Sequence, residues 1–166
     1  MDVAPLDWRP DTVFVQAGTS TRDAVVAGLG LRWSQPPRPG DFSGAVEVSL
    51  GQWSTRLTPQ VPANSALGDR AHVLQLVVIP LARWQPRQGA AWFFEGGVGL
   101  SLHDRHYRVE RVRQATRLNF QEEMAVGRVL GGGQAVSLRL AHMSNASLRK
   151  PNPGETWWSL RWELAW

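Results

Sequence analysis

Apolar and polar residues alternate along much of the chain, most clearly near its carboxyl end. From residue 158 onward every second residue is apolar, namely Trp158, Leu160, Trp162, Leu164 and Trp166. The residues between them include the charged pair Arg161 and Glu163. Successive side chains of a β-strand point to opposite faces, so this strand has one apolar and one polar face. The apolar face lies outward in a membrane β-barrel and inward in a soluble β-sandwich, and the alternation alone allows both.

Eight segments of this kind, separated by residues typical of turns, follow one another along the chain. They cover residues 12–18, 24–33, 45–57, 71–84, 91–102, 115–129, 134–143 and 155–166. An even number of strands joined in sequence closes into a barrel that leaves no unpaired strand edge in lipid. The pattern therefore predicts an all-β fold, an eight-stranded antiparallel up-and-down transmembrane β-barrel, as one domain over residues 1–166.

Two further features favour the barrel over the sandwich. Several of the nine tryptophans lie near predicted strand ends, as in the aromatic girdles at membrane interfaces: Trp33, Trp53, Trp84, Trp92, Trp157 and Trp166. Connections 34–40, 85–89 and 131–133 are rich in Pro and Gly, whereas connections 58–70, 103–114 and 144–154 are generally longer. Such barrels have short periplasmic turns and long outer loops, so the longer connections are predicted to face outside the cell.

The positions predicted to point into the barrel are small, polar or charged. Among them are Glu47, Glu95, Asn119, Gln121, Arg139 and Arg161. A hydrogen-bonded network of these side chains would fill the narrow lumen of an eight-stranded barrel, so we do not expect a pore.

Composition removes several classes of function. Cysteine is absent, which excludes disulfides, thiol nucleophiles and thiolate metal sites. The chain has four histidines, His72, His103, His106 and His142. None has a paired helical spacing with acidic residues, so we expect no metal site. No run of about 18 apolar residues is present, which excludes a transmembrane helix. No signal peptide is visible at residues 1–3, and we expect that one has been removed for export to the outer membrane.

The charge of the chain suits an anionic partner. There are 18 basic and 14 acidic residues, a net charge of +4, and every basic residue except Lys150 is arginine. The planar fork of arginine donates two hydrogen bonds to a phosphate at once. No basic tract interleaved with aromatic residues and no recognition helix is apparent. A phosphorylated lipid surface fits at least as well as nucleic acid, and nucleic acid is not expected as a partner.

His142 and Ser144 are the candidate catalytic pair. Two residues apart on an extended strand, they project from the same face, where imidazole can take the hydroxyl proton and make Ser144 a nucleophile. Glu155 opens the next strand and is expected to accept a hydrogen bond from the far nitrogen of His142. His142 shares its face with Val136 and Leu138, so the pair is predicted to face lipid, which indicates a membrane substrate. The alternative is a histidine that only caps backbone groups at a loop entrance.

The segment from His142 to Gly154 also carries a longer motif. It contains His-Met-Ser-Asn-Ala followed by Pro-Asn-Pro-Gly and resembles the signature of the lipid A 3-O-deacylase (PagL) family of outer-membrane enzymes. Residues 94–101 and 118–123 also look like the fifth and sixth strands of that family. The resemblance covers the C-terminal half by motif and the N-terminal half only by length and strand count. It implies an eight-stranded barrel, no cofactor, and removal of the ester-linked acyl chain at the 3 position of lipid A.

The resemblance also implies roles for individual residues. By position in the motif, Ser144 is the nucleophile, His142 the general base and then acid, and Glu155 the orienting acid. The implied oxyanion donors are the backbone amide of Ser147 and the side chain of Asn152. Two features depart from a familiar member: the spacing from the motif glycine to Glu155 is one residue shorter, and glycine is common where Ser147 stands.

Basic residues on the predicted outer connections are candidates for substrate binding. They are Arg111, Arg113, Arg149 and Lys150. They would hold the phosphates of lipid A or lipopolysaccharide in the outer leaflet, while the alternative is a solvated loop. A homodimer is left open.

Two rival functions remain at this point. One is a non-enzymatic barrel of the structural or adhesion type, and the other is an outer-membrane phospholipase that acts on glycerophospholipid. The known phospholipase has a comparable triad on a longer chain with more strands, so the length and the Pro-Asn-x-Gly segment disfavour it.

Overall fold

Eight strands close into one barrel in the computed structural model, which describes residues 9–35, 41–56, 70–87, 89–109 and 112–166. The barrel strands are β1 (Thr12–Ser20), β2 (Val25–Ser34), β3 (Phe42–Arg56), β4 (Arg70–Trp84), β5 (Trp92–His103), β8 (Leu118–Gly131), β9 (Gln134–Ser144) and β10 (Glu155–Ala165). Each pairs antiparallel with its neighbours, and β1 closes the barrel against β10. The predicted eight-stranded up-and-down barrel is therefore confirmed. A short hairpin of β6 (Arg108–Val109) and β7 (Val112–Arg113) lies in the connection between β5 and β8.

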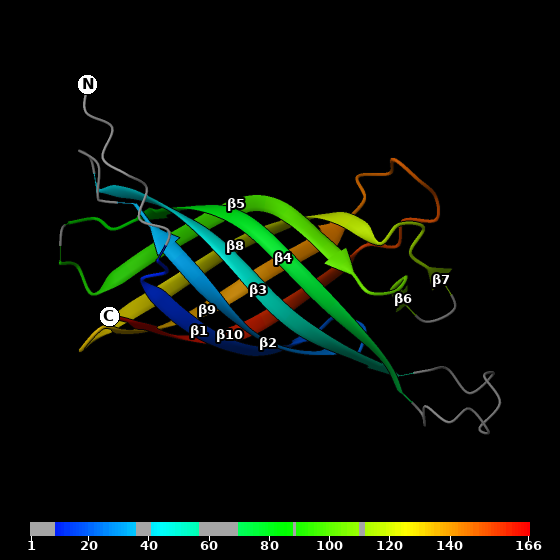
Figure 1. Ribbon diagram of the computed structural model, residues 1–166, viewed down its shortest axis with the longest axis horizontal. Coiled ribbons are helices and arrows are strands. Elements are labelled where there is room, and N and C mark those ends of the chain that lie inside the picture. Colours follow the sequence, from blue (N-terminus) through cyan, green and yellow to red (C-terminus); the bar gives the residue numbers. More distant parts are fainter. Residues whose placement is uncertain (1–8, 36–40, 57–69, 88, 110–111) are drawn as a thin grey trace.

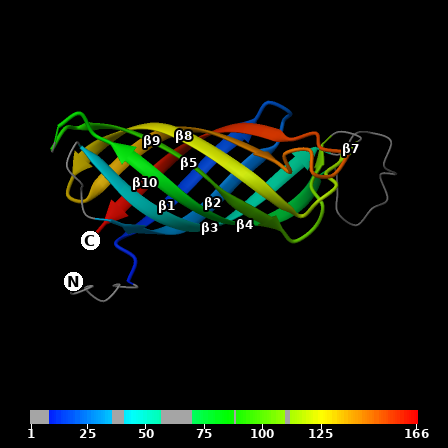
Figure 2. The same ribbon diagram turned by 90° about the horizontal axis from the view of Figure 1, so that it is seen from above.

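The two ends of the barrel differ. The start of β1 pairs with the end of β10, so this end, which we call the C-terminal end, holds the chain terminus (Figure 1). It also holds the tight turn from β8 to β9, where Gly131, Gly132 and Gly133 adopt positive φ angles of 98°, 58° and 75°. The β6–β7 hairpin and the β9–β10 connection lie together at the opposite end, which we call the loop end. The strands run obliquely to the long axis between these ends (Figure 2).

A charge-balanced network of buried side chains lies inside the barrel. It consists of four arginines and four glutamates: Arg32, Arg83, Arg139, Arg161, Glu47, Glu95, Glu123 and Glu163. Glu95 forms three ion pairs, with Arg32 at 2.8 Å, Arg83 at 2.7 Å and Arg139 at 2.8 Å. The inward positions predicted from the sequence are all buried, as expected for a filled lumen.

Aromatic side chains pack inside the barrel toward the loop end. Trp53 makes edge contacts with Tyr107 and Trp157, with ring centroids 5.3 Å and 4.7 Å apart. Its indole Nε1 donates a hydrogen bond to Gln75 at 2.7 Å. Met143 belongs to the same buried cluster. Met143 of β9 and Trp157 of β10 thus face inward near the loop end.

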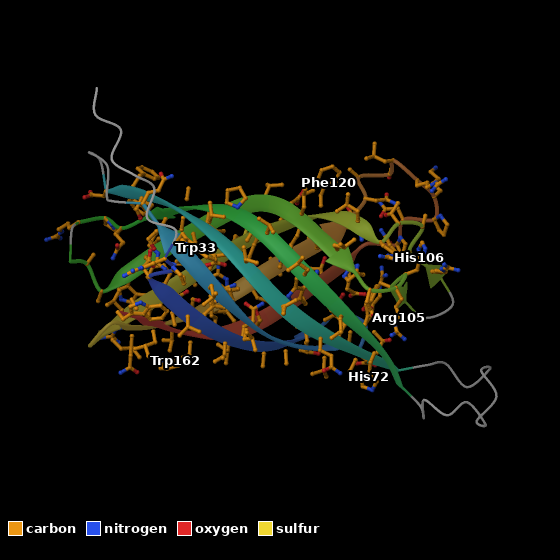
Figure 3. All side chains as sticks on the ribbon, viewed as in Figure 1. Trp33, His72, Arg105, His106, Phe120 and Trp162 are labelled. Atoms are coloured by element: carbon orange, nitrogen blue, oxygen red, sulfur yellow. The ribbon has the colours of Figure 1, made fainter. Side chains whose placement is uncertain are left out.

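The outer surface is largely apolar. Large apolar side chains are exposed on every barrel strand. On six of the eight strands at least one of them is exposed over more than half of its area, among them Leu29, Leu50, Leu74, Val98, Met124 and Leu160. Such a surface suits a hydrocarbon environment, as in a membrane barrel. Trp33 and Trp162 lie toward the C-terminal end, and Phe120 and His106 lie toward the loop end (Figure 3). No helix long and apolar enough to cross a membrane occurs in the part of the chain that the structure describes.

Candidate active site

His142 and Ser144 lie at the loop end of β9, where the strand enters the connection to β10. Buried and more exposed residues alternate along β9, and both side chains belong to the more exposed set together with Val136 and Leu138. Met143, between them, is buried inside the barrel. The structure therefore brings the predicted pair to one face of one strand, the face that carries exposed apolar side chains.

The imidazole of His142 is held by the neighbouring strand. Thr156 of β10 is the direct cross-strand partner of His142, and its Oγ1 lies 2.8 Å from Nδ1 of the ring. The other edge of the ring lies against Gly154, where a Cβ would come 3.0 Å from Cε1 and 3.3 Å from Nε2. Gly154 also has a φ of 60°, which favours glycine. The ring therefore lies between the hydroxyl of Thr156 and the backbone of Gly154.

Glu155 lies on the opposite side of the barrel wall from His142. It pairs with Met143, is only 2% exposed, and accepts a hydrogen bond from Tyr107 at 3.3 Å through Oε2. Burial raises the pKa of the Tyr107 hydroxyl, and the adjacent carboxylate acts in the same direction, so the hydroxyl stays protonated and donates. The structure does not bring Glu155 to His142, because consecutive residues of a strand face opposite sides. We therefore do not assign it the orienting role expected from the sequence.

The connection after Ser144 is held by side chains of its own. Asn152 accepts hydrogen bonds through Oδ1 from the backbone amide of Asn145 at 3.1 Å and from Gln114 at 2.9 Å. Because Oδ1 is used twice, the amide nitrogen is the end of Asn152 that remains to donate. Ser147 and the residue before it have left-handed φ angles of 60° and 51°, which cost about 1 kcal/mol or more each and recur at functional sites. The Ser144 hydroxyl oxygen accepts a hydrogen bond of 3.3 Å from the backbone amide of Ala146.

Strand β8 contributes two side chains opposite the candidate pair. Phe120 pairs with Ser144, and Glu122 pairs with His142. Both belong to the exposed set of β8. A row of three polar residues therefore crosses three neighbouring strands: Glu122, His142 and Thr156. We call it the polar row. Directly opposed side chains in an antiparallel pair have Cβ atoms about 4.5–5.5 Å apart, so His142 is within reach of both Glu122 and Thr156.

Two hollows flank the polar row. The first, of about 440 Å³, is lined by Leu118 and Phe120 of β8 and by Leu148 and Arg149 of the β9–β10 connection. Its lining includes Phe120, the cross-strand partner of Ser144, and Asn145, the residue that follows Ser144. The second, of about 270 Å³, is apolar and is lined by Met124, Leu138, Leu140 and Trp158, next to the row on its C-terminal side. One hollow therefore combines apolar and basic groups and the other is suited to hydrocarbon.

The basic residues predicted to bind substrate are only partly brought together. Arg149 lines the first hollow together with Arg117, which was not predicted from the sequence. Lys150 is exposed next to Arg149, and Arg113 is exposed on β7. Arg111 lies outside the described residues. Among the residues that the structure describes, no group of three or more His, Asp or Glu side chains could hold a metal ion.

Thr156 and Glu122 were not predicted either, although the alternation on β10 could have shown that Thr156 faces outward. Thr156 has the parity of the apolar residues Trp158 and Leu160, and Glu155 has the parity of the inward Arg161. The position of Glu122 opposite His142 follows from the pairing of β8 with β9, and the sequence pattern of a single strand does not reveal this pairing.

Comparison with known proteins gives consistent matches. A profile described as lipid A 3-O-deacylase (PagL) matches residues 26–165. The lipid A deacylase PagL of Bordetella bronchiseptica is 31% identical over 109 residues, which cover 63% of this chain and 60% of that protein. The lipid A deacylase PagL of Pseudomonas aeruginosa is 33% identical over 72 residues, 43% of this chain and 41% of that protein. The chain thus aligns with less than two thirds of the length of either relative.

Solved structures share the fold. The crystal structure of the outer membrane enzyme PagL superposes with a TM-score of 0.73 at 23% identity and covers 93% of this chain and 99% of that one. The Yersinia pestis outer membrane protein Ail gives a TM-score of 0.50 at 8% identity over 94% of this chain and all of that one. Because the family profile matches well over half of its residues, this chain belongs to the lipid A 3-O-deacylase (PagL) family.

Proposed function

We propose that this protein is an outer-membrane enzyme that hydrolyses the 3-O-acyl ester of lipid A, with Ser144 as the nucleophile and His142 as the general base. The observation that carries the proposal is the position of the pair, side by side at the loop end of an apolar outer surface. A polar pair at such a surface is costly unless it has a purpose. A substrate that itself lies in the membrane supplies that purpose, and family membership supports lipid A as that substrate.

The proposed reaction proceeds in two steps. Ser144 Oγ attacks the ester carbonyl carbon while His142 takes the hydroxyl proton. The bond from the carbonyl carbon to the sugar oxygen then breaks, the proton passes to that oxygen, and the acyl chain stays on Ser144. Water attacks the acyl carbonyl and gives its proton to His142, the acyl–serine bond breaks, and the proton returns to Ser144 as the fatty acid leaves. No cofactor takes part in these steps.

The negative oxygen of each tetrahedral intermediate needs donors. We assign this role to the backbone amide of Ser147 and to the side-chain amide of Asn152, as expected from the family motif. The bonds that Asn152 already accepts hold it in place and leave its NH₂ group to donate. Preorganised donors of this kind are typically worth about 10²- to 10³-fold in rate each.

Substrate binding is assigned to the surroundings of the pair. The apolar hollow beside Leu140 suits an acyl chain, and Arg149 at the other hollow suits a phosphate of the lipid A headgroup. Arg113 and Lys150 would act with it from the same end of the barrel, and Arg111, outside the described residues, stays a predicted member of this set. In this arrangement the loop end faces outside the cell and the C-terminal end faces the periplasm.

The test is to incubate the purified barrel in detergent with lipopolysaccharide and to follow lipid A by mass spectrometry, beside a Ser144→Ala variant. We expect the parent protein to remove one ester-linked acyl chain, and the variant to lose at least about 10³-fold of the rate. Glycerophospholipid is offered in a parallel reaction. Hydrolysis of that lipid alone would favour the phospholipase, and a folded parent that hydrolyses neither lipid would favour a non-enzymatic barrel.

A further inference from the structure

We propose that Thr156 is the positioning residue of this site: its hydroxyl, in place of a carboxylate, holds His142 in the orientation that serves Ser144. The inference rests on the proposed function, because it assigns a role within the same site. It starts from the contact of 2.8 Å between Oγ1 of Thr156 and Nδ1 of His142.

The pairing of β9 with β10 makes this contact specific. Thr156 and His142 are direct partners in the ladder, and the pairing continues in register through Trp158 and Leu140 to the C-terminal end of the strands. A shift of one residue would turn every side chain of β10 to the other face and bring the buried charges Arg161 and Glu163 outward. The register that fills the barrel therefore also places a threonine, and not Glu155, beside the imidazole.

A threonine hydroxyl can fix the tautomer that the reaction needs. Oγ1 can accept a hydrogen bond from Nδ1–H, and the ring then carries no proton on Nε2, the nitrogen that must take the proton of Ser144. Threonine is stiff about χ1, so its hydroxyl stays aimed at the ring. A carboxylate at this position would give the same orientation and would also offset the positive charge that His142 gains during the reaction. Thr156 supplies the orientation without the charge.

Within the described ranges, two charged residues lie around the imidazole on the neighbouring elements. From β8, the carboxylate of Glu122 belongs to the residue directly opposite His142. From the β1–β2 connection, Arg22 donates a hydrogen bond of 3.3 Å to the backbone oxygen of Gly154, which contacts the ring. From β10 and from β9 itself, the facing groups are the neutral hydroxyls of Thr156 and Ser144. A carboxylate at position 156 would take the place of the hydroxyl that lies 2.8 Å from Nδ1.

The experiment compares three substitutions at one position in the full-length barrel: Thr156→Val, Thr156→Ser and Thr156→Glu. We expect valine to lower kcat by about 10- to 100-fold with KM unchanged, the effect of one hydrogen bond to a group that becomes charged. Serine should keep most of the rate. Glutamate should raise kcat and move the acid limb of the pH profile to higher pH, because an anion favours the protonated ring. Thr19→Val, an exposed threonine whose partner on β10 is Trp158, is the matched control.

A spectroscopic measurement keeps this inference separate from the proposed function. Nitrogen NMR of histidine-labelled protein should place the proton of neutral His142 on Nδ1 in the parent and on a mixture of both nitrogens in Thr156→Val. A proton on Nε2 in the parent would overturn the inference, even in a barrel that deacylates nothing. An unchanged kcat in the valine variant, or equal losses in the valine and serine variants, would overturn it as well. Absence of any activity in the parent, with the tautomer as expected, counts against the proposed function alone.

Discussion

Polar residues differ in their surroundings on the two faces of the barrel wall. Inside, arginines and glutamates are buried, balanced in number and bonded to one another, as Arg139 is to Glu95 and Glu123. Outside, the polar row crosses a surface of exposed apolar side chains. A buried and paired group is part of the folded structure, and removing one partner leaves a costly charge. A polar group on a surface suited to lipid adds cost without such pairing, so it points to function.

Two consecutive residues of β10 show the contrast most directly. Glu155 points inward to Tyr107, and Thr156 points to His142 on the other face. Carboxylates are the usual partners of a catalytic histidine, so residue type alone selects Glu155. The geometry of the strand selects Thr156, because only every second side chain reaches a given face.

Within the polar row, the largest expected effect on rate is at its central residue, His142. His142→Ala removes the general base and should lower kcat by about 10²- to 10⁴-fold, while the barrel unfolds at the same denaturant concentration as the parent. Rates on lipopolysaccharide and urea unfolding in detergent are measured together. His72→Ala, at an exposed histidine of β4, is the matched control and should change neither. A His142→Ala variant that keeps the parent rate would remove the basis for the proposed mechanism.

The next effect belongs to the interior. Arg139→Met leaves Glu95 and Glu123 each short of a partner and should lower the free energy of unfolding by about 3–5 kcal/mol. The kcat of the folded fraction should stay within about twofold, because the network lies apart from the polar row. Arg128→Met, on the exposed set of β8, should change the unfolding free energy by less than about 0.5 kcal/mol. A large loss of kcat in folded Arg139→Met would show that the two faces are coupled.

The sequence was sufficient for features that depend on one strand at a time. Alternation along single strands predicted the barrel, the inward position of residues such as Glu47 and Arg161, and the shared face of His142 and Ser144. The interior positions and the shared face are confirmed; the catalytic roles remain predictions. The β6–β7 hairpin inside a connection was not predicted, because its strands are two residues each.

Features that depend on pairing between strands could not be predicted in the same way. The position of Glu122 opposite His142 depends on a register shift in β8 between Val129 and Gly131. Such a bulge changes which residues face each other without a clear mark in the alternation pattern. The partner of His142 on β10 likewise depends on the length and shape of the connection that joins the two strands.

A smaller effect is expected at the β8 end of the polar row. Glu122→Gln removes the carboxylate opposite His142 and should lower kcat by about fivefold, the size of one exposed charge interaction. The loss should shrink at high salt, since salt screens exposed charges. Rates are measured at low and high ionic strength. Arg128→Gln, exposed on the same strand, should leave kcat unchanged at both. Equal rates for the parent and Glu122→Gln at low salt would limit the working row to His142 and Thr156.

The smallest effect on rate is expected at Glu155, and it tests the comparison most sharply. Glu155→Gln keeps the shape of the side chain and an oxygen that can accept the bond from Tyr107. We expect kcat within about twofold of the parent and a stability change of about 1–3 kcal/mol at most, read from steady-state rates and urea unfolding. A loss of about 100-fold in kcat in a folded barrel would make Glu155 the orienting acid after all. A shift of the pairing register by one residue exchanges the two faces of a strand. That result would therefore also require β10 of the active enzyme to pair with β9 one residue away from the register in this structure.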